Sequence, residues 1–119
     1  MLDFLIDDAQ GTLVTSVSSK ALYDSKIDQW MDDRGITENG TAMAQAIKTL
    51  EETTELLDAI NHSNEAEIKD AIGDIYITLR GVCRVSNISL DKCIESAYNE
   101  IKDRKGYLTS QGTFVKTEC

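Results

Sequence analysis

The fold is decided by the stretch TAMAQAIKTLEETTELLDAINHSNEAEIKDAIGDIYITLRGVCRV, residues 41–85. Apolar side chains recur there at the three- and four-residue spacing of an amphipathic helix, first over Thr41–Ile60, with Thr41 as the N-cap. After the polar loop 61–64 the same spacing returns over Glu65–Val85. Because a short loop makes sequential helices neighbours, we expect these two to lie antiparallel.

Each of these helices carries an apolar stripe that we expect to form the core. The stripe of the first helix is Met43, Ile47, Leu50 and Leu57, and that of the second is Ile68, Ile72, Ile75, Leu79 and Val82. The first helix also has a second, semi-apolar side, on which Glu52 and Glu55 lie among alanine and leucine residues. That side is suited to packing against another element.

The flanking sequence predicts further helices. The pattern indicates a helix over 18–33, a turn over Gly35–Gly40, and a last helix from the N-cap Ser89 to about Lys105, with Gly106 as its C′ residue. The chain has no proline and only seven glycines, which favours an all-α fold. We therefore predict a four-helix bundle.

We expect one domain over residues 1–119. Its parts are an N-terminal arm at 1–17, a helical core at 18–106 and a tail at 107–119 that forms an exposed turn or a small hairpin. Residues 1–17 leave two alternatives, a short helix or an arm that packs on a partner subunit. A thin bundle of this length leaves much apolar surface uncovered, which favours self-association.

The composition excludes several classes of partner. A formal charge of −9 over 119 residues repels nucleic-acid backbones and anionic lipid surfaces. The N-terminal apolar stretch is too short for a secretory signal or a membrane span. Three cysteines without a CxxC pair argue against a disulfide framework. We expect a cytoplasmic protein that binds neither nucleic acid nor membrane.

The carboxylates of residues 41–74 are grouped by helix face. This stretch holds eight acids and two lysines. On the first helix Glu52 and Glu55 are i, i+3 neighbours, and on the second Glu67, Asp70 and Asp74 share one stripe. Two antiparallel helices can face these groups toward each other, and a hard dication such as Mg²⁺ would relieve their repulsion. The alternative is a plain solvated acidic face.

Three blocks in this order resemble the MazG-like family of all-α nucleoside triphosphate pyrophosphohydrolases. They are KTLEETTEL at 48–56, DAIGDI at 70–75 and AYNEIKDRKG at 97–106, and the similarity extends over about 27–116. The resemblance implies a helical bundle, usually a dimer or tetramer, that binds Mg²⁺ through EExxE and ExxD motifs. It also implies cleavage of a nucleoside triphosphate to a monophosphate and pyrophosphate.

The resemblance assigns metal ligands residue by residue. Glu52 and Glu55 match the ExxE acids, and Asp74 matches the aspartate of the second motif. The family's other acid stands three residues before that aspartate, where this chain has Ala71. Either Asp70 or Glu67 could replace the missing acid, and we choose Asp70 because it is one turn from Asp74.

Several residues are candidates for substrate binding. Asn99, Arg104 and Lys105 match the family's phosphate-side block, Lys102 lies on the same stripe, and Lys48 precedes the first acidic motif. Lys and Arg supply both donors and charge to phosphate, although favourable charge at a helix C-terminus would also explain the three bases of this block. Trp30 could stack on a nucleobase or serve as a core anchor.

We therefore expect a Mg²⁺-dependent enzyme, with Mn²⁺ as a possible substitute, that hydrolyses (d)NTP to (d)NMP and pyrophosphate in nucleotide-pool house-cleaning. Glu52, or its neighbour Glu51, would accept the proton of the attacking water. Specialists for dUTP or dCTP and phosphoribosyl-ATP hydrolases are rivals within this class. The alternative outside it is a non-catalytic helical module whose acidic face binds a basic partner.

Overall fold

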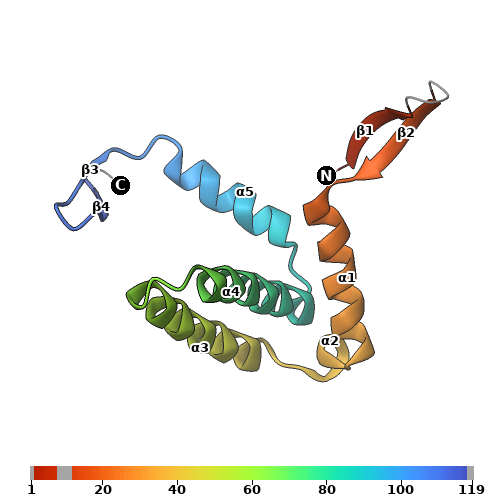
Figure 1. Ribbon diagram of the computed structural model, residues 1–119, viewed down its shortest axis with the longest axis horizontal. Helices are drawn as coiled ribbons and strands as arrows, with labels where there is room; N and C mark the ends of the chain where they lie inside the picture. The colour runs from red at the N-terminus through yellow and green to blue at the C-terminus, as the bar shows by residue number, and fades with distance from the viewer. Residues whose placement is uncertain (1, 8–11, 118–119) are drawn as a thin grey trace. The chain divides into compact units, whose positions relative to one another are not determined.

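The computed structural model describes residues 2–7 and 12–117 and divides the chain into two compact units, one ending at Ser86 and the other beginning at Asn87. The described part contains five helices and two antiparallel hairpins (Figure 1). The elements are β1 (Leu2–Asp7), β2 (Thr12–Val17), α1 (Ser19–Asp33), α2 (Ile36–Asn39), α3 (Ala42–Asn61), α4 (Glu65–Ser86), α5 (Leu90–Ile101), β3 (Gly106–Leu108) and β4 (Phe114–Lys116). None of the helices described is both long and apolar enough to cross a membrane.

The fold is mostly helical, but its N-terminus is not. Strands β1 and β2 pair with Leu2 opposite Val17, so the short helix considered for residues 1–17 is wrong, and the strictly all-α class needs this correction. Residues 1 and 8–11 of that segment lie outside the described residues. Whether the hairpin serves as an arm on a partner subunit stays a prediction.

Local capping explains where the helices of the first unit begin. The Ser18 hydroxyl accepts a hydrogen bond from the backbone of Ala21 at 3.2 Å, and the Thr41 hydroxyl accepts one from Ala44 at 3.0 Å. A loop precedes α4 as expected, but it covers 62–64, because Asn61 is still in α3. The expected turn over Gly35–Gly40 was wrong in part, because Gly35 adopts a φ of 74° and starts the short helix α2.

Helices α3 and α4 lie side by side and antiparallel (Figure 1). Small side chains line their interface, with Ala59 of α3 and Ala71 of α4 only 2% and 4% exposed. The hydroxyl of Thr49 donates to that of buried Thr78 at 2.8 Å, which joins the two helices. This is the second, semi-apolar side of α3 that the sequence suggested as a packing surface.

The predicted core stripe of α3 lies on the other side and is exposed. Met43 is 70% exposed and Leu57 is 65%, and Ile47 and Leu50 are also exposed. On α4, Ile72 and Leu79 are exposed, while Ile68, Ile75 and Val82 are half-buried. The expectation that these stripes form the core of one chain was therefore wrong for α3 and only partly right for α4.

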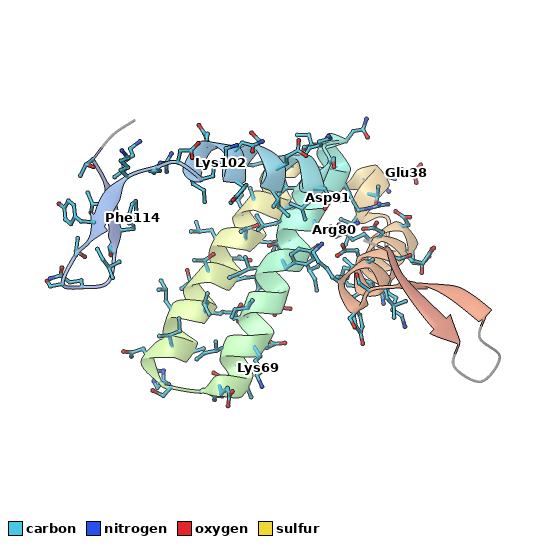
Figure 2. The ribbon with its side chains drawn as sticks, turned by 90° about the horizontal axis from the view of Figure 1, so that it is seen from above. Glu38, Lys69, Arg80, Asp91, Lys102 and Phe114 are labelled. Carbon is cyan, nitrogen blue, oxygen red and sulfur yellow. The ribbon has the colours of Figure 1, made fainter. Side chains whose placement is uncertain are left out.

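Helix α1 is joined to α4 by ion pairs. Figure 2 shows Arg80 reaching from α4 toward α1, where its Nε and Nη2 donate to Asp28 at 2.6 and 2.8 Å. One turn along, Arg84 donates to Asp32 at 2.6 Å. One turn the other way, the Tyr76 hydroxyl donates to Asp24 at 2.6 Å. We call this set the α1–α4 ladder.

The second unit contains α5 and the C-terminal hairpin. Ser89 caps α5 by accepting from Lys92, as expected, but the helix ends at Ile101, four residues before the predicted end at Lys105. Gly106 is the first residue of β3 and not a C′ residue, and it lies opposite Lys116 in β4. The predicted small hairpin in the tail is confirmed.

Candidate functional site

A pocket of about 550 Å³ opens between α3 and α4. Six of its eight lining residues are acidic; the lining consists of Glu52, Thr54, Glu55, Asp58, Glu67, Asp70, Ala71 and Asp74. We call it the acidic pocket. All four residues expected to bind metal line it, two from each helix, and so does Ala71, at the position where the sequence resemblance implied an acid.

The carboxylates in this pocket perturb one another. A hydrogen bond with Glu55, together with the negative charges of Glu55 and Asp74, raises the pKa of Glu52. Burial is the largest cause of the raised pKa of Asp74, and the negative charge of Asp70 and a hydrogen bond with it raise this pKa further. Each helix therefore contributes one close carboxylate pair, and the two pairs repel each other across the pocket.

These oxygen donors fit a hard dication. Within residues 2–7 and 12–117, no group of three or more His, Cys, Asp or Glu side chains is arranged to hold a metal ion. Mg²⁺ does not need such a cage, because it keeps several waters and uses one or two carboxylates together with substrate phosphates. Since a cation would relieve the repulsion that raises the pKa values of Glu52 and Asp74, the residues present suit Mg²⁺ or Mn²⁺.

Structure and spacing agree on which acid lies next to Asp74. The pKa of Asp74 responds to the charge of Asp70, and the two carboxyl groups are within hydrogen-bonding reach. Glu67 also lines the pocket, and its backbone N–H donates to the Asn64 side chain at the start of α4. Ala71 is buried against α3, so its methyl group forms part of the pocket wall.

A second cavity of about 620 Å³ adjoins the acidic pocket and shares Glu52 and Asp74 with it. Its remaining lining comes from α1, α2, α3 and α4 and is mostly apolar or aromatic: Tyr23, Lys26, Ile27, Trp30, Ile36, Gln45, Lys48, Ile77 and Thr78. We call it the apolar cavity. Two of the expected substrate-binding residues, Trp30 and Lys48, line it.

Trp30 is a wall of this cavity and not a core anchor. It is 43% exposed, whereas its neighbour Met31 is 1% exposed and forms the buried contact of α1. The guanidinium of Arg34 lies 4.6 Å from the centre of the indole ring. Such a cation–π contact holds the ring in place against one face.

Lys48 of α3 lines the apolar cavity and pairs with a neighbouring acid. Its Nζ lies 3.1 Å from Glu51, and the hydrogen bond with that carboxylate raises the pKa of the Lys48 ammonium group. Glu51 is thus engaged with Lys48, whereas Glu52, one residue on, lines both the acidic pocket and the apolar cavity.

Comparison with known proteins gives the family of this chain. Residues 41–108 match the family model described as the MazG nucleotide pyrophosphohydrolase domain. The chain belongs to the MazG family. A curated relative, named "Uncharacterized 18.2 kDa protein in rep-hol intergenic region" of Haemophilus phage HP1, is 38% identical over 53 residues, or 44% of this chain. The match spans 32% of that relative's length, and no solved structure matches.

The MazG match contains all four carboxylates expected to bind metal and the basic block of the second unit, but Trp30 lies outside it. In the second unit Asn99 is in the last turn of α5, Lys102 follows the helix, and Arg104 and Lys105 precede β3. All four are exposed. Because α5 ends at Ile101, Arg104 and Lys105 lie just beyond the helix C-terminus.

Sequence analysis missed several residues around the MazG site. Asp58 lines the acidic pocket, and Gln45 lines the apolar cavity. Gln45, Lys48 and Glu52 are spaced i, i+3, i+7, which places them on one stripe of α3. The ladder had a comparable signal, since Asp24, Asp28 and Asp32 repeat the four-residue spacing of Tyr76, Arg80 and Arg84.

Proposed function

We propose that this MazG chain is a Mg²⁺-dependent nucleoside triphosphate pyrophosphohydrolase that cleaves (d)NTP and water to (d)NMP and pyrophosphate in nucleotide-pool house-cleaning. The observation that supports this most directly is the shared wall of the two cavities. Glu52 and Asp74 border both the acidic pocket and the apolar cavity. A nucleotide can therefore present metal-bound phosphates to one side and its base to the other.

In this proposal Glu52, Glu55, Asp70 and Asp74 hold Mg²⁺, or Mn²⁺ in its place. When bound, the ion neutralises phosphate charge and lowers the pKa of a coordinated water. The protein's own part is to hold two carboxylate pairs on adjacent helices, so that both pairs face one pocket in which the ion would bind. Their repulsion, seen in the raised pKa values of Glu52 and Asp74, favours cation binding.

Glu52 is the proposed general base. Its carboxylate accepts a proton from the attacking water, whose oxygen forms a new bond to phosphorus as the P–O bond of the anhydride breaks, and the products are (d)NMP and pyrophosphate. Glu52 is suited to this role by its place, because it lines both the acidic pocket and the apolar cavity. Glu51 is less suited to this role because Lys48 pairs with it.

The remaining residues bind substrate. Trp30 stacks on the base, and Lys48 donates to a phosphate. We assign Asn99, Lys102, Arg104 and Lys105 of the second unit to the phosphate chain because exposed amide, ammonium and guanidinium donors match phosphate oxygens.

The test is incubation with a panel of (d)NTPs and Mg²⁺, with detection of pyrophosphate and the monophosphate. We expect pyrophosphate with Mg²⁺ or Mn²⁺ and none in EDTA. Reaction in ¹⁸O-labelled water then assigns the attacked phosphorus, because the label enters the monophosphate or the pyrophosphate accordingly. Absence of turnover on the whole panel would support the acidic interaction module instead, and full turnover in EDTA would exclude the metal.

We further propose a homodimer or homotetramer that covers the exposed stripe of α3, Met43, Ile47, Leu50 and Leu57. Burying a large apolar side chain contributes roughly 1.5–3 kcal/mol, so a chain that leaves this stripe in water gains by association. Light scattering coupled to gel filtration tests this. Leu50→Glu should shift the mass toward the monomer, and an unchanged mass would place the interface elsewhere.

A further inference from the structure

Gln45 is the polar side chain at the far end of the apolar cavity from the carboxylates. It lies on the same stripe of α3 as Glu52, seven residues earlier, or about 10.5 Å along the helix axis at 1.5 Å per residue. Its side chain is half-buried, and its amide makes no hydrogen bond to other residues in the described part of the chain. A nucleotide with its phosphates at Glu52 therefore carries its base toward this free amide.

The hydroxyl of Thr78, which also lines this cavity, is already engaged. Thr78 donates to the backbone carbonyl of Ile75 at 2.8 Å and accepts from Thr49 at 2.8 Å. The neighbouring cavity walls are the apolar and aromatic side chains of Ile27, Trp30 and Ile77. An amide in such surroundings offers both a donor and an acceptor that a ligand can satisfy.

Gly81 of α4 fixes where this amide lies. A Cβ at position 81 would lie 2.5 Å from Oε1 of Gln45, 3.1 Å from its Cδ and 3.3 Å from its Cγ. The glutamine side chain thus rests directly on the bare backbone of α4, and no larger residue fits without moving it. Glycine within a helix is about 1 kcal/mol less favourable than alanine, so the space for the amide has an energetic cost.

We infer that Gln45 recognises the hydrogen-bonding edge of the nucleobase and that Gly81 is the residue that positions it. This rests on the proposed function, since the base enters the cavity with its phosphates at the carboxylates. The inference makes Gln45 a determinant of base preference. A base whose edge leaves the half-buried amide unpaired binds more weakly than one that satisfies it.

The test uses nucleosides without phosphate or metal, so that the apolar cavity is probed by itself. Trp30 is the single tryptophan of the chain and lines this cavity, which makes its fluorescence the readout. For the wild-type protein we expect the Kd values of the tightest and the weakest common nucleoside to differ by about tenfold or more, which equals about 1.4 kcal/mol. Gln45→Leu should bring all of them to within about threefold, since the amide contribution is lost.

Gln45→Glu gives a directional result. The ionised carboxylate accepts hydrogen bonds but donates none, while the side chain keeps nearly the same shape. The ranking should move toward nucleosides with an exocyclic amino group and away from those with only carbonyl groups on that edge. Gln111→Leu, in the exposed tail, is the matched control and should leave the ranking unchanged.

Gly81→Ala tests the positioning role. The added methyl group should displace the amide and flatten the ranking in a protein that remains helical by circular dichroism. Gln45→Asn in the Gly81→Ala background shortens the side chain and should restore part of the ranking. Gly73→Ala is the control on the same helix, because a Cβ there meets nothing within 4 Å.

The outcomes separate this inference from the proposed enzyme. Pyrophosphate release together with an unchanged ranking in Gln45→Leu keeps the enzyme and overturns the role of Gln45. A ranking that depends on Gln45 without pyrophosphate release keeps the base site and overturns the enzyme. Failure of every nucleoside to change Trp30 fluorescence at millimolar concentration overturns the inference directly.

Discussion

Helix α4 makes two contacts of different kinds, one with α3 and one with α1. Against α3 the backbones approach closely, because Ala59, Ala71 and Gly81 leave little side chain between them. Against α1 the connection is made by long side chains, in which Arg80 spans to Asp28 and Tyr76 to Asp24. The first contact carries the carboxylates and the second holds the helix that bears Trp30.

Because of this difference, we expect the α3–α4 contact and the α1–α4 contact to respond differently to salt and acid. Close packing of small residues fixes the distance between the carboxylate pairs and changes little with salt. Partly exposed ion pairs are weakened by salt and by acid. The metal side should therefore be rigid, and the wall of the base cavity should respond to solution conditions.

The largest effect is expected in the acidic pocket. Asp74→Ala and Glu55→Ala should each lower kcat by about a thousandfold or more, since metal-based charge stabilisation contributes several kcal/mol. Removing one of several repelling carboxylates relieves strain without metal, so the melting temperature in EDTA should hold or rise. Near wild-type turnover in either variant would mean that the acidic pocket is not the metal site.

The next effect separates the two candidates for the missing acid. Asp70→Asn should lower kcat/KM by about tenfold or more, well beyond Glu67→Gln, because Asp70 is one turn from Asp74 and Glu67 is two. Ala71→Glu in the Asp70→Asn background should recover part of the rate, since position 71 lines the pocket. Equal, small losses for Asp70→Asn and Glu67→Gln would leave Glu52, Glu55 and Asp74 as the working set.

The third prediction breaks the α1–α4 ladder. Arg80→Met should cost about 2 kcal/mol in the free energy of unfolding, because it removes the bidentate donor of the half-buried Asp28 and leaves that carboxylate only Arg84, at 3.2 Å, as a charged partner. Lys69→Met is the matched control, since the exposed Lys69–Glu65 pair should contribute about 0–1 kcal/mol. Urea unfolding of both variants measures the difference. Equal losses in the free energy of unfolding would mean that the α1–α4 ladder stabilises the fold no more than an exposed ion pair does.

A smaller effect is expected from the hydroxyl pair between α3 and α4. Thr78→Val keeps the shape of the side chain and removes its hydrogen bond to Thr49, with an expected loss of about 1 kcal/mol. The loss should be the same in low and high salt, unlike that of Arg80→Met. A strong salt dependence for Thr78→Val would contradict the distinction between the two contacts.

The smallest effect concerns the stability of the protein at acidic pH. Burial acts to raise the pKa of Asp24, but hydrogen bonds from Tyr76 and Lys20 and the charge of Arg80 outweigh it and lower the pKa. A lowered folded-state pKa means that this stabilisation is present above about pH 4 and is lost as the pH falls below it. Asp24→Asn should therefore make unfolding less pH-dependent between about pH 4 and 2. A slope identical to the wild type would show that Asp24 does not contribute.

The helices were predictable from sequence because their signals are local. Thr41 and Ser89 mark helix starts by their own side-chain hydrogen bonds, and both were found. The carboxylate grouping was also predictable, because three- and four-residue spacing fixes which acids share a face of α3 or α4. The MazG resemblance is confirmed by the match over 41–108, while the assignments of individual site residues remain proposals.

The buried side of α3 was not predictable, since periodicity shows that a helix has an apolar side but not which neighbour covers it. Met43 and Leu50 are more hydrophobic than Ala59, yet they are exposed and Ala59 is buried. Small residues allow a close approach that hydrophobicity alone does not indicate. The role of Gln45 was hidden for a similar reason, because it depends on Gly81, which is 36 positions away in sequence.

The exposed stripe of α3 has a consequence for how the stability of this protein should be measured. Under the proposed assembly, part of the free energy of folding is gained only when two chains meet. For a dimer, each tenfold dilution would remove about 1.4 kcal/mol from that free energy. A melting temperature for this chain would then belong to a stated protein concentration, and a variant compared at a different one would seem altered through dilution alone.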